Sequence, residues 1–87
     1  MPATVFDYRR VAAAAKGALQ EAFSDSLIET EEGFAGRVHI KIVSPKFNGK
    51  NEKRKQNMVW EVLKAELEPE DLAGVSLVMP YGMDDLP

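Results

Sequence analysis

The chain has 87 residues, of which 45% are hydrophobic and 29% are charged, and its formal net charge is −3. A chain of this length forms one domain with a modest core, because such domains bury about 60–65% of the surface that the unfolded chain exposes. We therefore predict a single domain over residues 1–87. The absence of cysteine excludes disulfides, a thiolate nucleophile and a thiolate metal ligand.

No stretch of the sequence approaches the roughly 18 apolar residues of a membrane helix. The start of the chain carries Asp7, Arg9 and Arg10 where a secretory signal has an unbroken apolar core. We therefore expect a cytoplasmic protein without membrane contact.

The first predicted element is an amphipathic helix that begins after Asp7, a residue type favoured at helix N-caps, and ends near Phe23. Its apolar side chains recur with three-four spacing, so they lie on one face of the helix. This stripe consists of Tyr8, Val11, Ala12, Ala15, Leu19, Ala22 and Phe23. Because several of these side chains are small, the helix can approach a sheet closely.

Two strands are predicted next, over residues 26–31 and 37–43, with a turn over residues 32–36 between them. The second strand alternates clearly between apolar and polar side chains. Its two faces carry Val38, Ile40 and Ile42 on one side and Arg37, His39 and Lys41 on the other. This alternation is typical of an antiparallel sheet with one face exposed to water.

Turn-forming residues over 44–51 precede a second helix, predicted over residues 52–67. Its buried arc consists of Met58, Val59, Val62, Leu63 and Leu67. Glu66 falls at a position that this arc would bury, so its carboxylate must reach the rim of the core or find a partner. A short helical turn over residues 69–72 and a third strand over residues 75–79 follow. One face of that strand is predicted to carry Val75, Leu77 and Met79.

The predicted order is helix, strand, strand, helix, short helix, strand, which gives an α+β fold with a three-stranded mixed sheet and the helices on one face. By the handedness of crossover connections, we expect the third strand to lie parallel to the strand that ends at Val43. Residues 1–6 and 81–87 are expected to be flexible tails, and the second of these contains the paired carboxylates Asp84 and Asp85.

The sequence Val-His-Ile-Lys-Ile-Val-Ser-Pro-Lys-Phe-Asn-Gly-Lys over residues 38–50 resembles the BolA-like family, in which a strand ending in Val-Ser is followed, after an intervening pair, by Phe-x-Gly-Lys. The likeness continues in Met58 and Val59, in residues 74–79 and in the acidic residues 83–86. The resemblance implies a fold similar to the type II KH arrangement. It also implies an association with monothiol glutaredoxins and iron–sulfur cluster trafficking, and a link to nucleic-acid binding and transcriptional control.

The sequence departs from this family at both positions that supply cluster ligands there. The family usually has Arg-His-Arg before the Met-Val pair, and that histidine is the shared cluster ligand, whereas this chain has Lys55, Gln56 and Asn57. The second ligand, a histidine or cysteine between the first two strands, has no counterpart in residues 32–36. Because a neutral amide is a poor iron ligand, we predict a divergent member without a cofactor, with a cluster shared with a glutaredoxin as the alternative.

His39 is the only histidine of the chain. We expect it on the exposed face of the sheet, and it is a weak candidate for a metal ligand or a pH sensor. Glu29 and Glu31 could complete a metal site if the strand register brings them opposite His39. Charge pairing of these carboxylates with Arg37 and Lys41 is the alternative.

The middle of the chain is locally basic, and its glycine-containing loop leads into a helix N-terminus, where free N–H groups and the helix dipole favour an anion. The candidate residues for binding a partner or nucleic acid are Lys46, Phe47, Gly49, Lys50, Lys53, Arg54, Lys55 and Gln56. The Gly-x-x-Gly loop of KH domains is absent there, and only Gly49 is present. A solvated charged face and a protein-docking surface stay open as alternatives, because the whole chain is acidic.

The sequence offers no catalytic set: there is no cysteine, no Ser-His-Asp arrangement, no phosphate-binding glycine fingerprint and no pair of histidines. We predict a non-enzymatic adaptor that docks on a protein partner, such as a monothiol glutaredoxin, through residues 46–56. Phe47 and Trp60 are candidate apolar anchors, with core packing as the alternative for both. The alternative function is a KH-like nucleic-acid-binding regulator that uses the same basic surface.

Overall fold

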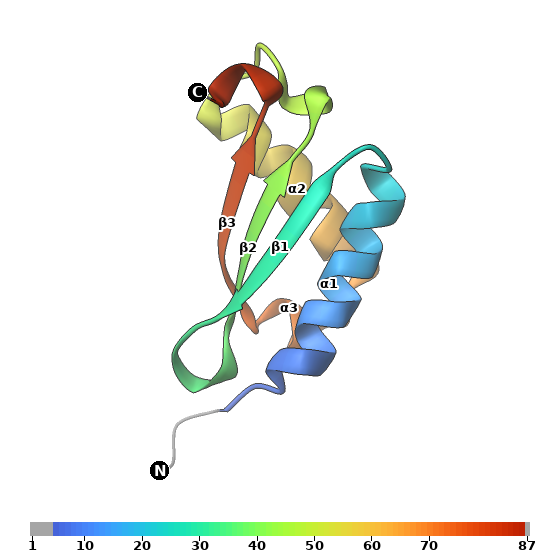
Figure 1. Cartoon of the computed structure of the whole chain (residues 1–87). Coiled ribbons are helices and arrows are strands. Elements are labelled where there is room, and N and C mark those ends of the chain that lie inside the picture. The colour runs from blue at the N-terminus through green and yellow to red at the C-terminus, as the bar shows by residue number, and fades with distance from the viewer. Residues whose placement is uncertain (1–4, 87) are drawn as a thin grey trace.

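The computed structural model of the chain describes residues 5–86 (Figure 1). Its helices and strands are, in chain order, α1 (Tyr8–Ala22), β1 (Leu27–Glu32), β2 (Val38–Val43), α2 (Glu52–Glu66), α3 (Pro69–Leu72) and β3 (Val75–Tyr81). Three short 3-10 turns are η1 (Phe34–Gly36), η2 (Pro45–Phe47) and η3 (Met83–Asp85). The predicted order of helices and strands is confirmed.

The three strands form one mixed sheet in the order β1-β2-β3. β1 pairs antiparallel with β2, and β2 pairs parallel with β3. α1 and α2 lie on the same side of this sheet (Figure 1). The predicted α+β fold, including the parallel third strand, is therefore confirmed. In the described part of the chain, no helix has the length and apolar character that crossing a membrane requires.

α1 begins where the sequence predicts. The carboxylate of Asp7 accepts a hydrogen bond from the backbone N–H of Arg10 at 3.3 Å, which satisfies one of the free donors of the first turn. The buried residues of the helix belong to the predicted stripe and are Val11, Ala12, Ala15 and Leu19. The helix ends at Ala22, and the buried ring of its C-cap residue, Phe23, joins the core.

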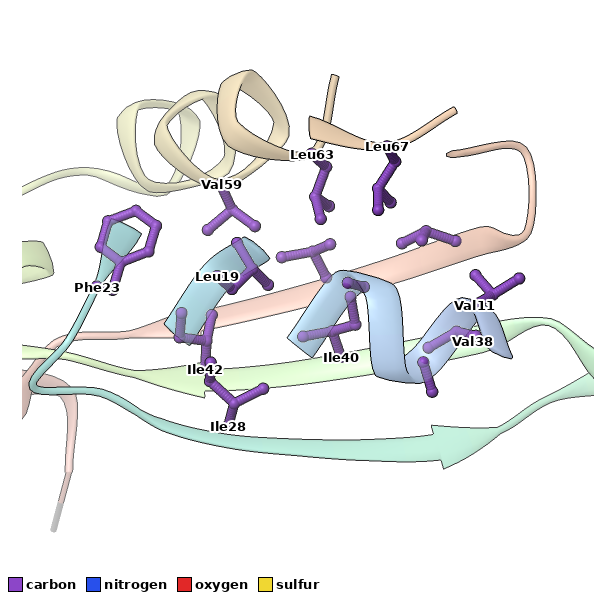
Figure 2. Close-up of a cluster of buried hydrophobic side chains, with 14 of the residues drawn as sticks. Val11, Leu19, Phe23, Ile28, Val38, Ile40, Ile42, Val59, Leu63 and Leu67 are labelled. Carbon is purple, nitrogen blue, oxygen red and sulfur yellow. The ribbon is translucent and has the colours of Figure 1, made fainter. Parts of the chain in front are cut away.

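The core lies between the sheet and the two long helices. Figure 2 shows Ile40 and Ile42 of β2 on the side of the sheet that faces Leu19 of α1 and Val59 of α2. All four side chains are fully buried. The predicted alternation of β2 is thus confirmed, and truncation of any one large aliphatic side chain here would cost about 2–5 kcal/mol of stability.

The facing of β3 differs from the prediction. We expected Val75, Leu77 and Met79 on one face, but Val78 and Pro80 join Val75 in the interior and Leu77 is 43% exposed. The alternation therefore shifts by one residue after Val75.

A β-bulge causes this shift. Val38 pairs with Val75, but His39, the next residue of β2, pairs with Leu77, so Ser76 is left over. The strand also continues past the predicted end to Tyr81. The strand can include Pro80 because β3 lies at the edge of the sheet. On the outer side of an edge strand a backbone N–H makes no hydrogen bond to another strand, so its absence in proline costs none.

Two further expectations differ from the structure. Glu66 was expected at a buried position of the second helix, but it is exposed, since α2 turns Val59 and Leu63 toward the sheet. Residues 81–86 were expected within a flexible tail, but they include the end of β3 and η3. Residues 1–6 were expected to form the other flexible tail, but the backbone N–H of Phe6 donates a hydrogen bond to the carbonyl of Ala35 at 2.8 Å. Residues 1–4 and 87 lie outside the described part of the chain.

Candidate functional site

The candidate residues 46–56 lie at the end of the sheet where β2 ends and α2 begins (Figure 1). Ser44 is buried and its hydroxyl accepts a hydrogen bond from the backbone N–H of Lys46 at 3.1 Å, which starts η2. The side chain of Asn51 caps α2 by accepting a hydrogen bond from the N–H of Arg54 at 2.8 Å. Two side-chain caps therefore fix the backbone on both sides of the loop.

Lys50, Lys53 and Arg54 are exposed on this loop and on the first turn of α2, and we call them the basic surface. None of the three takes part in an ion pair within residues 5–86. Lys46 is exposed as well, but its ammonium donates to the carbonyl of Ala22 at 3.1 Å and lies 5.7 Å from the centre of the Phe23 ring. Lys46 is therefore attached to the end of α1.

Phe47 is fully buried and does not offer a surface to a partner. Its ring lies 5.1 Å from the ring of Phe23, measured between centroids, in a tilted arrangement. Such aromatic pairs stabilise a core beyond the area that they bury. The core alternative is the one that the structure shows for Phe47.

Lys55 is also buried, with only 5% of its surface exposed. Its ammonium donates to the carboxylate of Asp85 at 2.8 Å, and Glu52 lies farther away, at 3.6 Å. The hydrogen bond to Asp85 raises the pKa of Lys55 against the opposing effect of burial. The same hydrogen bond, together with one from the N–H of Gly82, lowers the pKa of Asp85. Both groups are thus held in their charged forms, and Lys55 serves the fold as a buried cation.

Residues 82–86, which we call the C-terminal clasp, contact the loop between β2 and α2. The carboxylate of Asp84 accepts a hydrogen bond from the N–H of Gly49 at 2.8 Å. The N–H of Met83 donates to the side-chain carbonyl of Asn48 at 2.6 Å. A Cβ at Gly82 would lie 2.8 Å from the same Asn48 oxygen, so the two segments approach closely.

Sequence reasoning missed the contribution of the clasp to the site. The signal that could have found it is the acidic residue three positions after Gly82, because Asp85 accepts from the N–H of Gly82 at 2.7 Å as an acidic residue does in a capping box. The contacts with Asn48 and Gly49 bridge 35 residues of sequence, and nothing local predicts them.

Gln56 is half-buried and both ends of its amide are occupied. Its nitrogen donates to the backbone carbonyl of Val78 in β3 at 2.7 Å, and its oxygen accepts from the indole N–H of Trp60 at 3.1 Å. Gln56 therefore ties α2 to the edge strand. Trp60 is half-buried and packs against the core, as the core alternative has it.

His39 is partly exposed on the side of the sheet away from the helices. Glu31 is its partner across the strands and Glu29 is the partner of Lys41, yet no ion pair joins these side chains in the described residues. Within residues 5–86, no three histidine, cysteine, aspartate or glutamate side chains are placed to hold a metal ion. A Cβ at Gly33 would lie 2.5 Å from Nε2 of His39, so the imidazole packs over this glycine.

A scan against models of protein families finds no match, and a search of curated proteins finds no significant relative. Among solved structures, the chain is similar to BolA1 from Arabidopsis thaliana, with 20% sequence identity and a TM-score of 0.64 over 88% of this chain and 96% of that chain. It is also similar to the BolA domain of SufE1 from Arabidopsis thaliana, with 20% identity and a TM-score of 0.66 over 88% of this chain and 95% of that chain. The chain has the BolA-like fold.

The structure shows the surroundings of the two positions at which the sequence departs from the family, Gln56 and the hairpin between β1 and β2. Gln56, at the place of the ligand histidine implied by the resemblance, uses its amide to join β3 and Trp60. The hairpin between β1 and β2 carries Phe34 in an exposed position and has neither histidine nor cysteine in residues 33–36. A neutral amide already engaged at both ends does not fit the role of an iron ligand.

Proposed function

We propose that the chain is a non-catalytic adaptor with the BolA-like fold that docks on a protein partner through the basic surface and the C-terminal clasp. The supporting observation is the combination of the three cations of the basic surface with two exposed apolar side chains of the clasp. Met83 is 53% exposed and Leu86 is 42% exposed. The hydrogen bonds of Asp84 and Asp85 hold these side chains beside the loop that carries Lys50.

This mixture of charge and apolar surface favours a protein partner. Apolar side chains at the centre of a small surface contribute binding energy when water is excluded, and a charged rim adds specificity and a faster encounter. An acidic partner surface would complement Lys50, Lys53 and Arg54. Of the proteins that the family resemblance implies, a monothiol glutaredoxin is the partner we propose, bound without a shared cluster because of Gln56.

The test is anaerobic co-expression of the tagged chain with a monothiol glutaredoxin, followed by pull-down and visible absorption of the purified material. We expect a colourless complex that is lost in the variant Lys53→Glu/Arg54→Glu. Lys64→Glu is the matched control, because Lys64 is exposed in the last turn of the same helix and has no place in the basic surface. Failure to recover any complex would contradict the choice of glutaredoxin.

A coloured complex would contradict cluster-independent binding, and the variant His39→Ala then decides whether the one histidine has become a ligand. Loss of colour in this variant would assign the ligand to His39, whereas retained colour would exclude it.

The second candidate function is nucleic-acid binding. It is favoured by the exposure of the basic surface, whose three cations have no ion partner within residues 5–86. Three cations that each neutralise one phosphate of a single strand give a slope of about −2 in a plot of log K against log salt concentration. Titration of a fluorescent single-stranded oligonucleotide at several ionic strengths tests this function directly. Binding with that slope would support it, and failure to bind at low salt would contradict it.

A further inference from the structure

Two carboxylates of the C-terminal clasp accept hydrogen bonds from donor groups that lie next to the basic surface. Asp84 accepts from the N–H of Gly49 at 2.8 Å, and Asp85 accepts from the ammonium of Lys55 at 2.8 Å. These donors belong to the segment from which binding of an anionic partner is expected. The chain thus holds its own acidic residues where a partner's acidic residues would bind.

The buried ammonium of Lys55 requires an anion at this place. Its side chain is only 7% exposed, and a buried charge that loses its partner is strongly unfavourable. Glu52, at 3.6 Å, is a more distant and largely exposed alternative. If Asp85 leaves, another carboxylate in the same position restores the lost interaction, so the site selects for an acidic replacement.

The second donor, the N–H of Gly49, lies on the surface of the loop. Its hydrogen bond to Asp84 is exposed, as is Gly49 itself. An incoming chain can therefore reach this N–H when Asp84 leaves it. Together, the N–H of Gly49 and the ammonium of Lys55 form a pair of donors that fits two adjacent carboxylates.

The clasp is held by hydrogen bonds and an ion pair and not by buried apolar side chains. Its only helical turn has three residues, and both of its large apolar side chains, Met83 and Leu86, are more than two-fifths exposed. Segments with few buried apolar contacts and exposed hydrogen bonds open at a small fraction of the global free energy of unfolding. The clasp can therefore open while the sheet and helices stay folded.

We propose that the C-terminal clasp is an internal competitor of the docking surface, and that the partner binds with an acidic peptide segment whose two adjacent carboxylates replace Asp84 and Asp85. The clasp has an apolar residue, two acidic residues and a second apolar residue in sequence, and we expect the same order in the segment of the partner. This inference rests on the basic surface of the proposed function and changes the part that the clasp plays in it. In the complex the partner's segment takes the place of the clasp, and the partner's own apolar side chains lie where Met83 and Leu86 lie in the free chain.

The test uses the full chain and a blocked synthetic peptide with the sequence Gly-Met-Asp-Asp-Leu, which reproduces residues 82–86. The variant Asp84→Ala/Asp85→Ala should bind this peptide at least about tenfold more tightly than the unmodified chain, because the competing clasp is weakened. Binding is followed by the NMR signals of the Gly49 amide and the Lys55 side chain. A peptide with Asn-Asn in place of Asp-Asp should not bind.

The control variant is Glu61→Ala/Glu68→Ala, which removes the same charge from exposed positions outside the clasp and should leave the affinity for the peptide unchanged. Asp84→Ala alone keeps the Lys55–Asp85 pair and should give a smaller gain, of about threefold, so the test survives if the double variant does not fold. Equal affinity of the unmodified chain and both clasp variants would overturn the proposal. Preference of the double variant for an oligonucleotide over the peptide would overturn it as well.

The peptide titration needs no glutaredoxin, so its outcome is independent of the pull-down. A variant that binds the peptide while the chain fails to recover a glutaredoxin would support the clasp and reject the named partner. A glutaredoxin complex without peptide binding would support the adaptor and reject the clasp.

Discussion

At the hairpin end of the sheet an aromatic side chain is exposed on a strained backbone, whereas at the basic end the aromatic side chain is buried and the charges are exposed. The two ends lie at opposite ends of β2 (Figure 1). Phe34 in the hairpin is 79% exposed, and Phe47 in the loop after β2 has no exposed surface. Burial of Phe47 anchors the loop, and the anchored loop presents Lys50 at a fixed position.

The hairpin end has a different organisation. Ala35 has φ of 58°, a left-handed conformation that costs an L-residue about 1–2 kcal/mol, and the bond from the N–H of Phe6 to its carbonyl supports it. Phe34 beside it contributes little to the core. The two ends therefore differ in stability. The basic end presents exposed charges on a loop that the buried ring of Phe47 stabilises, whereas the turn of the hairpin end lowers stability through the left-handed backbone of Ala35.

The largest effect that would sharpen this comparison is expected from the two phenylalanines. Phe47→Ala should lower the free energy of unfolding by about 3–5 kcal/mol, because it removes a fully buried ring. Phe34→Ala should change it by no more than about 0.5 kcal/mol. Urea unfolding followed by the fluorescence of Trp60 measures both. Similar losses in the two variants would break the distinction between the ends.

Glycines with positive φ offer a second test, because they stand at both ends. Gly49 has open space around it, so Gly49→Ala should cost only the left-handed conformation, about 1 kcal/mol. At Gly36, with φ of 77°, a Cβ would also collide with the carbonyl oxygen of Phe6. Gly36→Ala should therefore cost at least about 1 kcal/mol more than Gly49→Ala.

The control for the glycine pair is Gly17→Ala in α1. This position is helical and has no atom within 4 Å of a built Cβ, so the substitution should stabilise the chain by about 1 kcal/mol. Equal free energies of unfolding for Gly36→Ala and Gly49→Ala would mean that the hairpin adjusts without loss, contrary to the strain argued for it.

The sequence predicted the fold wherever a local period was strong. The alternation of Val38, Ile40 and Ile42 depends only on neighbouring residues, and the same is true of the stripe on α1 and its cap at Asp7. The face of β3 could not be predicted, because a bulge defined by the pairing of His39 with Leu77 shifts the alternation. A bulge is a property of two strands together and leaves no mark in either sequence alone.

The candidate site was less predictable for the same reason. The charged run around Lys55 predicts an exposed cation at this position. Lys55 is instead buried, because Asp85, thirty residues later in the chain, pairs with its ammonium. Phe47 has no periodic context, and Phe23, its aromatic neighbour, comes from the end of another element. The exposure of Lys50, Lys53 and Arg54 was predictable, because exposure is the ordinary state of charged residues.

The smallest effect concerns pH, and it separates the basic end from the rest of the molecule. The folded chain lowers the pKa of Asp85 from its ordinary value of 3.8, chiefly through the hydrogen bond from Lys55. The contribution of Asp85 to stability is therefore complete above that value and is lost as pH falls through the lowered folded pKa. For Lys55 the sign is reversed, because its folded pKa is raised above 10.5.

The contribution of Lys55 is therefore complete below its ordinary pKa and is lost as pH rises through the raised one. Urea midpoints measured from pH 2 to 6 and from pH 9 to 12 should show both losses in the unmodified chain. Asp85→Asn should flatten the curve at both extremes. The substitution removes the carboxyl group that titrates in acid, and it also removes the partner of Lys55, which titrates in alkali. Glu61→Gln, which removes an exposed carboxylate of α2, should keep the curve of the unmodified chain. An unchanged curve for Asp85→Asn would show that the pair does not couple the C-terminal clasp to α2 in solution.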